Sequence, residues 1–103
     1  MSDAPPRQYT AFTERFPDLA DAWTRIGEAG RSGPLDARTA RLVKLALAIG
    51  TLREGAVHAA VRKARSAGAT PEDFDHVIRL AAGTIGFPAT VAAFTWVQET
   101  LSP

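Results

Sequence analysis

Apolar side chains recur every three or four residues along most of the chain, which is the repeat of an amphipathic α-helix. The first stripe predicts a helix over residues 12–26, with Pro17 in the first turn of its main part, where proline is tolerated. Gly27, Gly30 and Gly33–Pro34 are expected to end this helix. The apolar positions of the stripe are Phe12, Phe16, Leu19, Ala20, Trp23 and Ile26.

The middle of the chain predicts two further helices. One begins at the N-cap candidate Asp36 and ends near Ile49; it is apolar almost all round, as in a helix buried on several sides. The next covers about residues 52–67 and stops at Gly68, because glycine readily adopts the left-handed conformation that closes a helix.

The last third predicts two more helices. Thr70-Pro71-Glu72-Asp73 combines a hydroxyl N-cap, a proline at the first helical position and acids in the positive first turn. We expect the glycines and proline of residues 83–88 to break this fourth helix, and a last helix to cover about residues 89–101. The side chains expected to face inward are Phe74, Val77, Ile78 and Ala81 in the fourth helix and Val91, Ala92, Trp96 and Val97 in the last.

No segment shows the alternation of a β-strand, so the sequence predicts an all-α protein. Its 103 residues suit a single domain over residues 1–103. Residues 1–10 are expected to form a flexible N-terminal arm, because the opening holds two prolines and little apolar content. No apolar run approaches the roughly 18 residues of a membrane span and no secretory signal is evident, so we expect a cytoplasmic protein without a membrane partner.

Composition removes several kinds of chemistry. The chain has no cysteine, which excludes disulfides, thiolate metal sites and cysteine redox cycles. A net charge of +1 gives no global reason to expect a nucleic-acid partner. Residues 38–65 do hold seven basic residues against Glu54 alone, but they lack interleaved aromatics and a recognition helix. We expect this basic segment to be a solvated face or to pair with the acidic N-terminal helix of another subunit.

Alanine makes up about a fifth of the chain, and alanines bury little area each. A small alanine-rich bundle therefore favours further burial between subunits. Phe87, Phe94 and Trp96 are candidates for such a surface, and completion of the chain's own core is an equally good explanation for them.

The third predicted helix carries the candidate chemistry. Glu54, His58, Arg62 and Arg65 fall within one polar arc. A carboxylate one turn before an imidazole can accept its N–H and leave the second nitrogen for proton transfer, and an arginine can bind an anionic substrate. The same spacing is also typical of a solvated surface pair, so it leaves both interpretations open.

Two other possibilities are set aside at this stage. The Glu54–His58 pair offers two ligands, and two ligands from one chain are too few for a metal site without help from another subunit, so none is expected. His76 lies among Glu72, Asp73 and Asp75, and we expect it to be exposed and to have no catalytic role.

Five blocks of residues follow one another in a recognisable order and spacing: Leu42–Ile49, Glu54–His58, Ala64, Gly68–Glu72 and Gly86–Pro88. Together they resemble the carboxymuconolactone decarboxylase family, an all-α group that includes the alkylhydroperoxidase D proteins. The resemblance covers about half of the chain and implies a compact oligomeric bundle of five to six helices. The peroxidase members carry a Cys-x-x-Cys pair where this chain has Thr51 and Glu54, so the resemblance is to the branch without redox cysteines.

The resemblance implies a cofactor-free carboxy-lyase of aromatic-acid breakdown that acts on a small anionic lactone or a related acid. His58 would be the general acid/base, Glu54 would orient it, and Arg62, assigned by its spacing, would bind the substrate carboxylate. Family members assemble as trimers or hexamers, which agrees with the burial argument. Gly55 and Thr84–Ile85 differ from the decarboxylase pattern, so the substrate stays open. A catalytically silent member that serves as an oligomeric binding or scaffold protein is the alternative.

Overall fold

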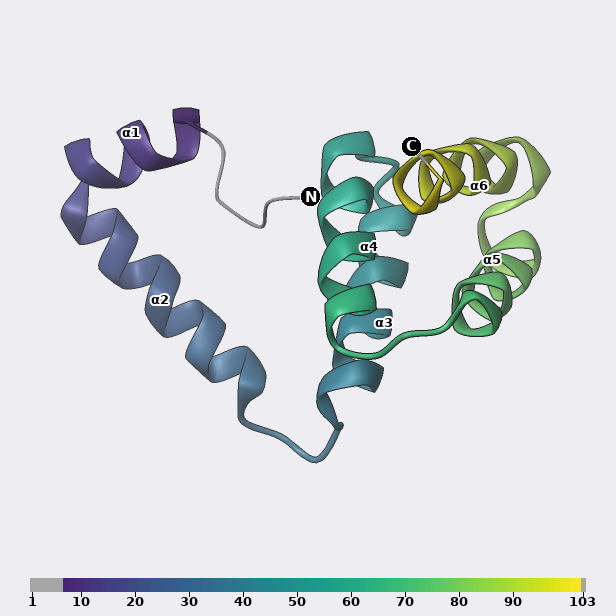
Figure 1. Ribbon diagram of the computed structural model, residues 1–103, viewed down its shortest axis with the longest axis horizontal. Coiled ribbons are helices and arrows are strands. Elements are labelled where there is room, and N and C mark those ends of the chain that lie inside the picture. Colours follow the sequence, from purple (N-terminus) through teal and green to yellow (C-terminus); the bar gives the residue numbers. More distant parts are fainter. Residues whose placement is uncertain (1–6, 103) are drawn as a thin grey trace. The chain divides into compact units, whose positions relative to one another are not determined.

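The computed structural model describes residues 7–102, and these form six α-helices and no strand (Figure 1). The prediction of an all-α protein is therefore confirmed. The contacts divide the chain after Pro34 into two compact units. None of the helices in residues 7–102 is long and apolar enough to cross a membrane. The helices are α1 (Arg7–Arg15) and α2 (Pro17–Arg31) in the first unit, and α3 (Ala37–Gly50), α4 (Glu54–Ser66), α5 (Pro71–Ile85) and α6 (Phe87–Leu101) in the second.

The first unit differs from its prediction in three ways. Helix α1 begins at Arg7, so residues 7–10 of the expected arm are helical, and the rest of the arm lies outside the described residues. The single predicted stripe is split at Phe16, whose backbone is not helical, and Pro17 opens α2. Gly27 and Gly30 lie inside α2, because a glycine costs a helix only about 1 kcal/mol.

The starts of α3 and α5 are as predicted. The side chain of Asp36 accepts a hydrogen bond from the backbone N–H of Thr39 at 2.8 Å. At α5 the backbone N–H of Asp73 donates to the Thr70 hydroxyl at 3.2 Å, and the Thr70 N–H donates to the Asp73 carboxylate at 2.9 Å. The backbone hydrogen bond to each carboxylate lowers the pKa of Asp36 and of Asp73. Polar side chains thus fix where these two helices begin.

Each connection between helices α3, α4, α5 and α6 contains a residue with positive φ. Leu52 adopts φ 53°, and α4 accordingly begins at Glu54 rather than at residue 52. Gly68 has φ 99° and follows α4, as predicted for its C-terminal stop. Helix α5 continues through Gly83, and the break expected over residues 83–88 is confined to Gly86 at φ 86°.

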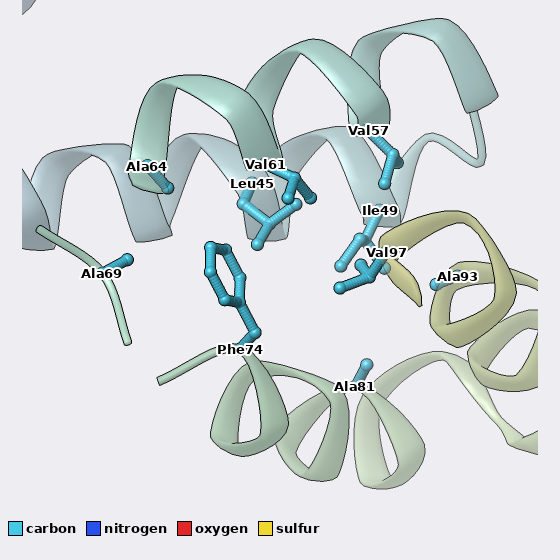
Figure 2. Packing of buried hydrophobic residues seen from close by; sticks show 10 residues of the cluster. All are labelled: Leu45, Ile49, Val57, Val61, Ala64, Ala69, Phe74, Ala81, Ala93 and Val97. Carbon is cyan, nitrogen blue, oxygen red and sulfur yellow. The ribbon is translucent and has the colours of Figure 1, made fainter. Parts of the chain in front are cut away.

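The core lies among the four helices of the second unit. Helix α3 packs against α4 and α5, and α6 packs against the same two helices. In Figure 2 the Phe74 ring extends from α5 toward Leu45 of α3 and Val61 of α4. These contacts hold α4 and α6 in fixed register, which positions the polar residues at their shared edge. The buried apolar residues are Leu45, Ile49, Val57, Val61, Ala64, Ala69, Phe74, Ala81, Ala93 and Val97.

Some predicted burial is not observed. Helix α3 is buried along one side, at Leu45 and Ile49, and its Leu47 is 66% exposed. Val91, expected to face inward, is exposed. Of the three aromatics proposed for either a surface or the core, Trp96 packs on the core. The other two, Phe87 and Phe94, are exposed.

Candidate functional site

His58 and Glu54 meet on α4, as the helical spacing predicts. Glu54 is the first residue of the helix, where a carboxylate suits the positive end of the dipole. Its Oε2 atom lies 3.2 Å from Nε2 of His58, one turn further on. The Glu54 side chain is 56% exposed and the His58 side chain 23%, so solvent reaches the pair mainly from the carboxylate side.

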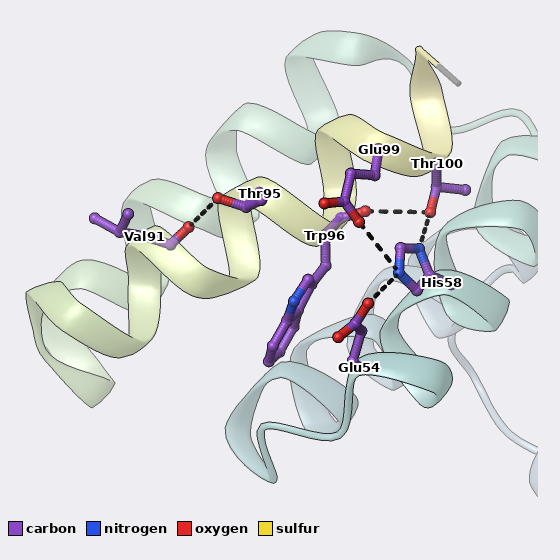
Figure 3. Close-up of polar contacts among 7 residues, drawn as sticks. All are labelled: Glu54, His58, Val91, Thr95, Trp96, Glu99 and Thr100. Carbon is purple, nitrogen blue, oxygen red and sulfur yellow. Dashed lines mark hydrogen bonds and ion pairs between the residues drawn. The ribbon is translucent and has the colours of Figure 1, made fainter.

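Helix α6 adds two residues to this pair (Figure 3). Oε2 of Glu99 lies 3.7 Å from the same Nε2 atom of His58, so two carboxylates face one imidazole nitrogen. On the opposite edge of the ring, Nδ1 of His58 forms a hydrogen bond with the hydroxyl of Thr100. The packing of α4 on α6 brings these four side chains together.

The Thr100 hydroxyl links the imidazole to the backbone of α6. It donates to the carbonyl oxygen of Trp96 at 3.2 Å, and its oxygen can then accept the Nδ1–H of His58. Thr100 is only 6% exposed, so water has little access to this edge of the ring. We predicted that one imidazole nitrogen would stay free, whereas both have partners, and Nε2 is the nitrogen that faces solvent-exposed groups.

The predicted arginine does not join this cluster. Arg62 follows His58 by one turn on α4 and is partly buried. Within residues 7–102 it forms no hydrogen bond with Glu54, His58 or Glu99. The expected basic face is present beside it: burial lowers the pKa of Lys63, and the charges of Arg41, Lys44 and Arg62 lower it further. Of the same basic segment, Arg38 forms an ion pair with Asp73 at 3.5 Å.

Glu54, His58 and Glu99 together offer three ligand groups of the kinds that bind metal ions. Their nearest ligand atoms all lie within 4.8 Å of one another. The expectation of no metal site rested on a supply of two ligands from one chain, and the fold supplies a third. His76 is exposed, as expected.

Sequence reasoning missed Glu99 and Thr100. Both lie more than 40 residues from His58 along the chain, and helical periodicity carries no information about such distant pairs. One signal was available: Glu99 is the only acid in a last helix that is otherwise apolar or uncharged. The structure places this carboxylate beside His58.

A model of the carboxymuconolactone decarboxylase family matches residues 17–99. This match covers most of the chain, and it includes Glu54, His58 and Glu99. The chain therefore belongs to the carboxymuconolactone decarboxylase family, and its lack of cysteine fits the branch without the redox cysteine pair. No curated protein and no solved structure matches the chain.

Proposed function

We propose that the protein is a cofactor-free carboxy-lyase that removes carbon dioxide from a small anionic lactone or a related acid. Family membership supports the reaction class. The observation that carries the proposal is the anchored imidazole: Thr100 holds Nδ1 of His58, and Nε2 is directed toward exposed carboxylates. A fixed imidazole with one accessible nitrogen suits a general acid/base.

The reaction needs a single proton delivered to carbon. When the bond from the substrate carbon to its carboxylate breaks, carbon dioxide leaves and the electron pair stays on the lactone. Nε2–H of His58 then donates its proton to that carbon. Glu54 and Glu99 lie within reach of the same nitrogen and would hold the charged imidazole in place until transfer.

An anionic substrate must approach two carboxylates, so the site needs positive charge. The imidazolium of His58 would supply one charge, and Arg62, one turn further along α4, would supply another. We assign Arg62 as the group that binds the substrate carboxylate. The two charges together would balance Glu54 and Glu99.

We further propose that the chain self-associates as a homotrimer or homohexamer. Helices α1 and α2 contain no buried residue, although they carry a regular apolar stripe. Trp23 is 58% exposed, and Phe87 of α6 is 75% exposed. Exposed apolar side chains of this size, present in both units, are typical of surfaces that another protein copy covers.

The test is turnover of 4-carboxymuconolactone, followed by the loss of the lactone's absorbance. We expect wild type to consume the substrate and His58→Ala to be slower by a factor of roughly 10²–10⁴, the usual contribution of a general acid or base. His76→Ala is the matched control, because that histidine is exposed and outside the cluster, and it should keep wild-type activity. Light scattering should give the same particle size for all three proteins.

Two outcomes would contradict the proposal. Equal activity in wild type and His58→Ala would remove His58 from the reaction. The absence of turnover in wild type, with Glu54→Ala and His58→Ala leaving the assembly unchanged, would instead favour the alternative of a catalytically silent scaffold. The exposed apolar surface is the observation that supports this second function.

A further inference from the structure

We propose that Glu54, His58 and Glu99 bind one divalent transition-metal ion of the Zn²⁺ class. The inference goes beyond the lyase proposal and does not require it. Both proposals involve Nε2 of His58, but in different protonation states. A general acid needs a proton on this nitrogen, whereas a metal ion binds to its unprotonated lone pair.

The distances suit a single ion. Nitrogen and oxygen ligands lie roughly 2.0–2.2 Å from Zn²⁺, so neighbouring ligands of a tetrahedral or octahedral ion are about 2.8–3.6 Å apart. Nε2 of His58 lies 3.2 Å from the Glu54 oxygen and 3.7 Å from the Glu99 oxygen. In Figure 3 both carboxylates point toward this nitrogen from different helices. All three ligand atoms lie within 4.8 Å of one another, so one ion could contact them after the exposed carboxylate side chains move closer together.

The hydrogen bonds of Thr100 are compatible with a lone pair on Nε2 of His58. Its hydroxyl donates to the carbonyl of Trp96, and its oxygen can then accept from Nδ1 of His58. In the neutral imidazole this leaves Nε2 unprotonated and facing two carboxylates. Either a proton on Nε2 or a metal ion between the three groups would offset the repulsion between this lone pair and the two carboxylates. Metal-binding histidines commonly have such an arrangement, in which the second nitrogen donates to a fixed acceptor.

The donor set indicates the kind of ion. Two carboxylates and one neutral imidazole carry a formal charge of −2, which a divalent cation neutralises. The imidazole favours Zn²⁺, Co²⁺ or Fe²⁺ over Mg²⁺ and Ca²⁺, which prefer oxygen ligands throughout. The carboxylates are more than half exposed, so an ion can enter from solvent and retain water at its remaining positions.

The two proposals make opposite demands on Nε2 of His58. A bound ion occupies the lone pair that would otherwise carry the proton, so metal loading should suppress the proton transfer of the lyase. We therefore expect Zn²⁺ to act as an inhibitor of the decarboxylation, if that reaction occurs. The metal site itself is tested without any substrate.

The full chain is first treated with a chelator to remove bound metals, and the chelator is then removed by dialysis. The experiment titrates this metal-free chain with Co²⁺. We expect the visible d–d absorption of Co²⁺ to saturate at one ion per chain and to disappear when Zn²⁺ is added. Glu99→Gln and His58→Gln should each weaken binding roughly tenfold or more, because a ligand is lost. Glu72→Gln and His76→Gln make the same exchanges at exposed positions on α5 and should bind like wild type.

Thr100→Val tests the anchoring of the ring. It removes the hydroxyl with little change of shape, and we expect about tenfold weaker Co²⁺ binding with unchanged far-ultraviolet circular dichroism. Should Glu99→Gln fail to fold, Glu54→Gln replaces it, because that side chain is equally exposed.

Three results would overturn the metal site: no Co²⁺ absorption in wild type, equal affinity in Glu99→Gln and wild type, or loss of binding in His76→Gln. Each is independent of the lyase. A chain that binds Co²⁺ at this site but turns over no lactone contradicts the lyase alone. A chain that turns over lactone but binds no Co²⁺ contradicts the metal site alone.

Discussion

Helices α1 and α2 carry as regular an apolar stripe as helices α3–α6, but the two groups differ in how far their apolar side chains are buried. In the second group Leu45, Val57 and Val61 are fully buried. In the first group neither helix contains a buried residue, and Phe12 and Trp23 are exposed. The difference teaches that periodicity identifies which residues share a face, and that the fold decides what covers that face.

The lack of buried residues should make α1 and α2 less stable than the other helices. Isolated helices of fewer than about 12–15 residues are marginal in water, and most helix stability in proteins comes from packing of the apolar face. Helix α1 has 9 residues and α2 has 15, and within the chain their contacts include the tilted rings of Phe12 and Phe16 at 5.1 Å. We therefore expect α1 and α2 to open before the α3–α6 core unless another copy of the chain covers their stripe.

The sharpest test of the contrast is a pair of identical substitutions. Phe74→Ala should lower the free energy of unfolding by about 3–5 kcal/mol, because it leaves a cavity in the core. Phe12→Ala removes the same atoms from a half-exposed position and should cost about 1 kcal/mol or less. Urea denaturation at one protein concentration measures both. An equal loss in the two variants would mean that the stripe is as buried in solution as the core.

The next test concerns the self-association proposed above. Trp23→Ala truncates the largest side chain of the exposed stripe and should weaken assembly by about 2 kcal/mol, or roughly 30-fold in dissociation constant. Asp21→Ala changes the opposite side of the same helix and serves as the control. Sedimentation velocity over a range of concentrations reports the change. Identical behaviour of Trp23→Ala and wild type would exclude this stripe as the interface.

The smallest expected effect lies at the start of α5, which has a complete capping box, whereas α2 has no side-chain cap. Thr70→Ala should cost about 1 kcal/mol. The lowered pKa of Asp73 means that its contribution to stability is complete above the ordinary carboxyl pKa. That contribution is lost as the pH falls through the lowered value.

Variants of the two capping-box residues should differ in how their thermal stability depends on pH. Asp73→Asn should reduce the acid-side dependence of stability, because it removes the titrating group. Thr70→Ala should keep most of that dependence, since the backbone N–H of residue 70, the main cause of the lowered pKa, still donates to Asp73. The same slope in wild type and Asp73→Asn would contradict this assignment.

The sequence predicted the part of the candidate site that lies on α4, but not the part that lies on α6. Glu54 and His58 are neighbours because a helix places residues four apart on one side, which holds whatever surrounds the helix. Glu99 and Thr100 could not be placed, because their approach to His58 depends on how α6 crosses α4. Arg62 is the opposite case. Its spacing suggested that it belongs to the site, but within the described residues it forms no hydrogen bond or ion pair with Glu54, His58 or Glu99.

The sequence by itself determined the helical class, the caps at Asp36 and Thr70, the stop at Gly68 and the family, since each depends on local chemistry or on short patterns. Only the tertiary structure decided which apolar stripes are buried. It also decided that both nitrogens of His58 have partners and that a second carboxylate faces Nε2. The physical reason is the sequence separation of the interacting residues. Hydrogen bonds within a helix are fixed by neighbours in sequence, whereas contacts between helices depend on side-chain packing across the whole core.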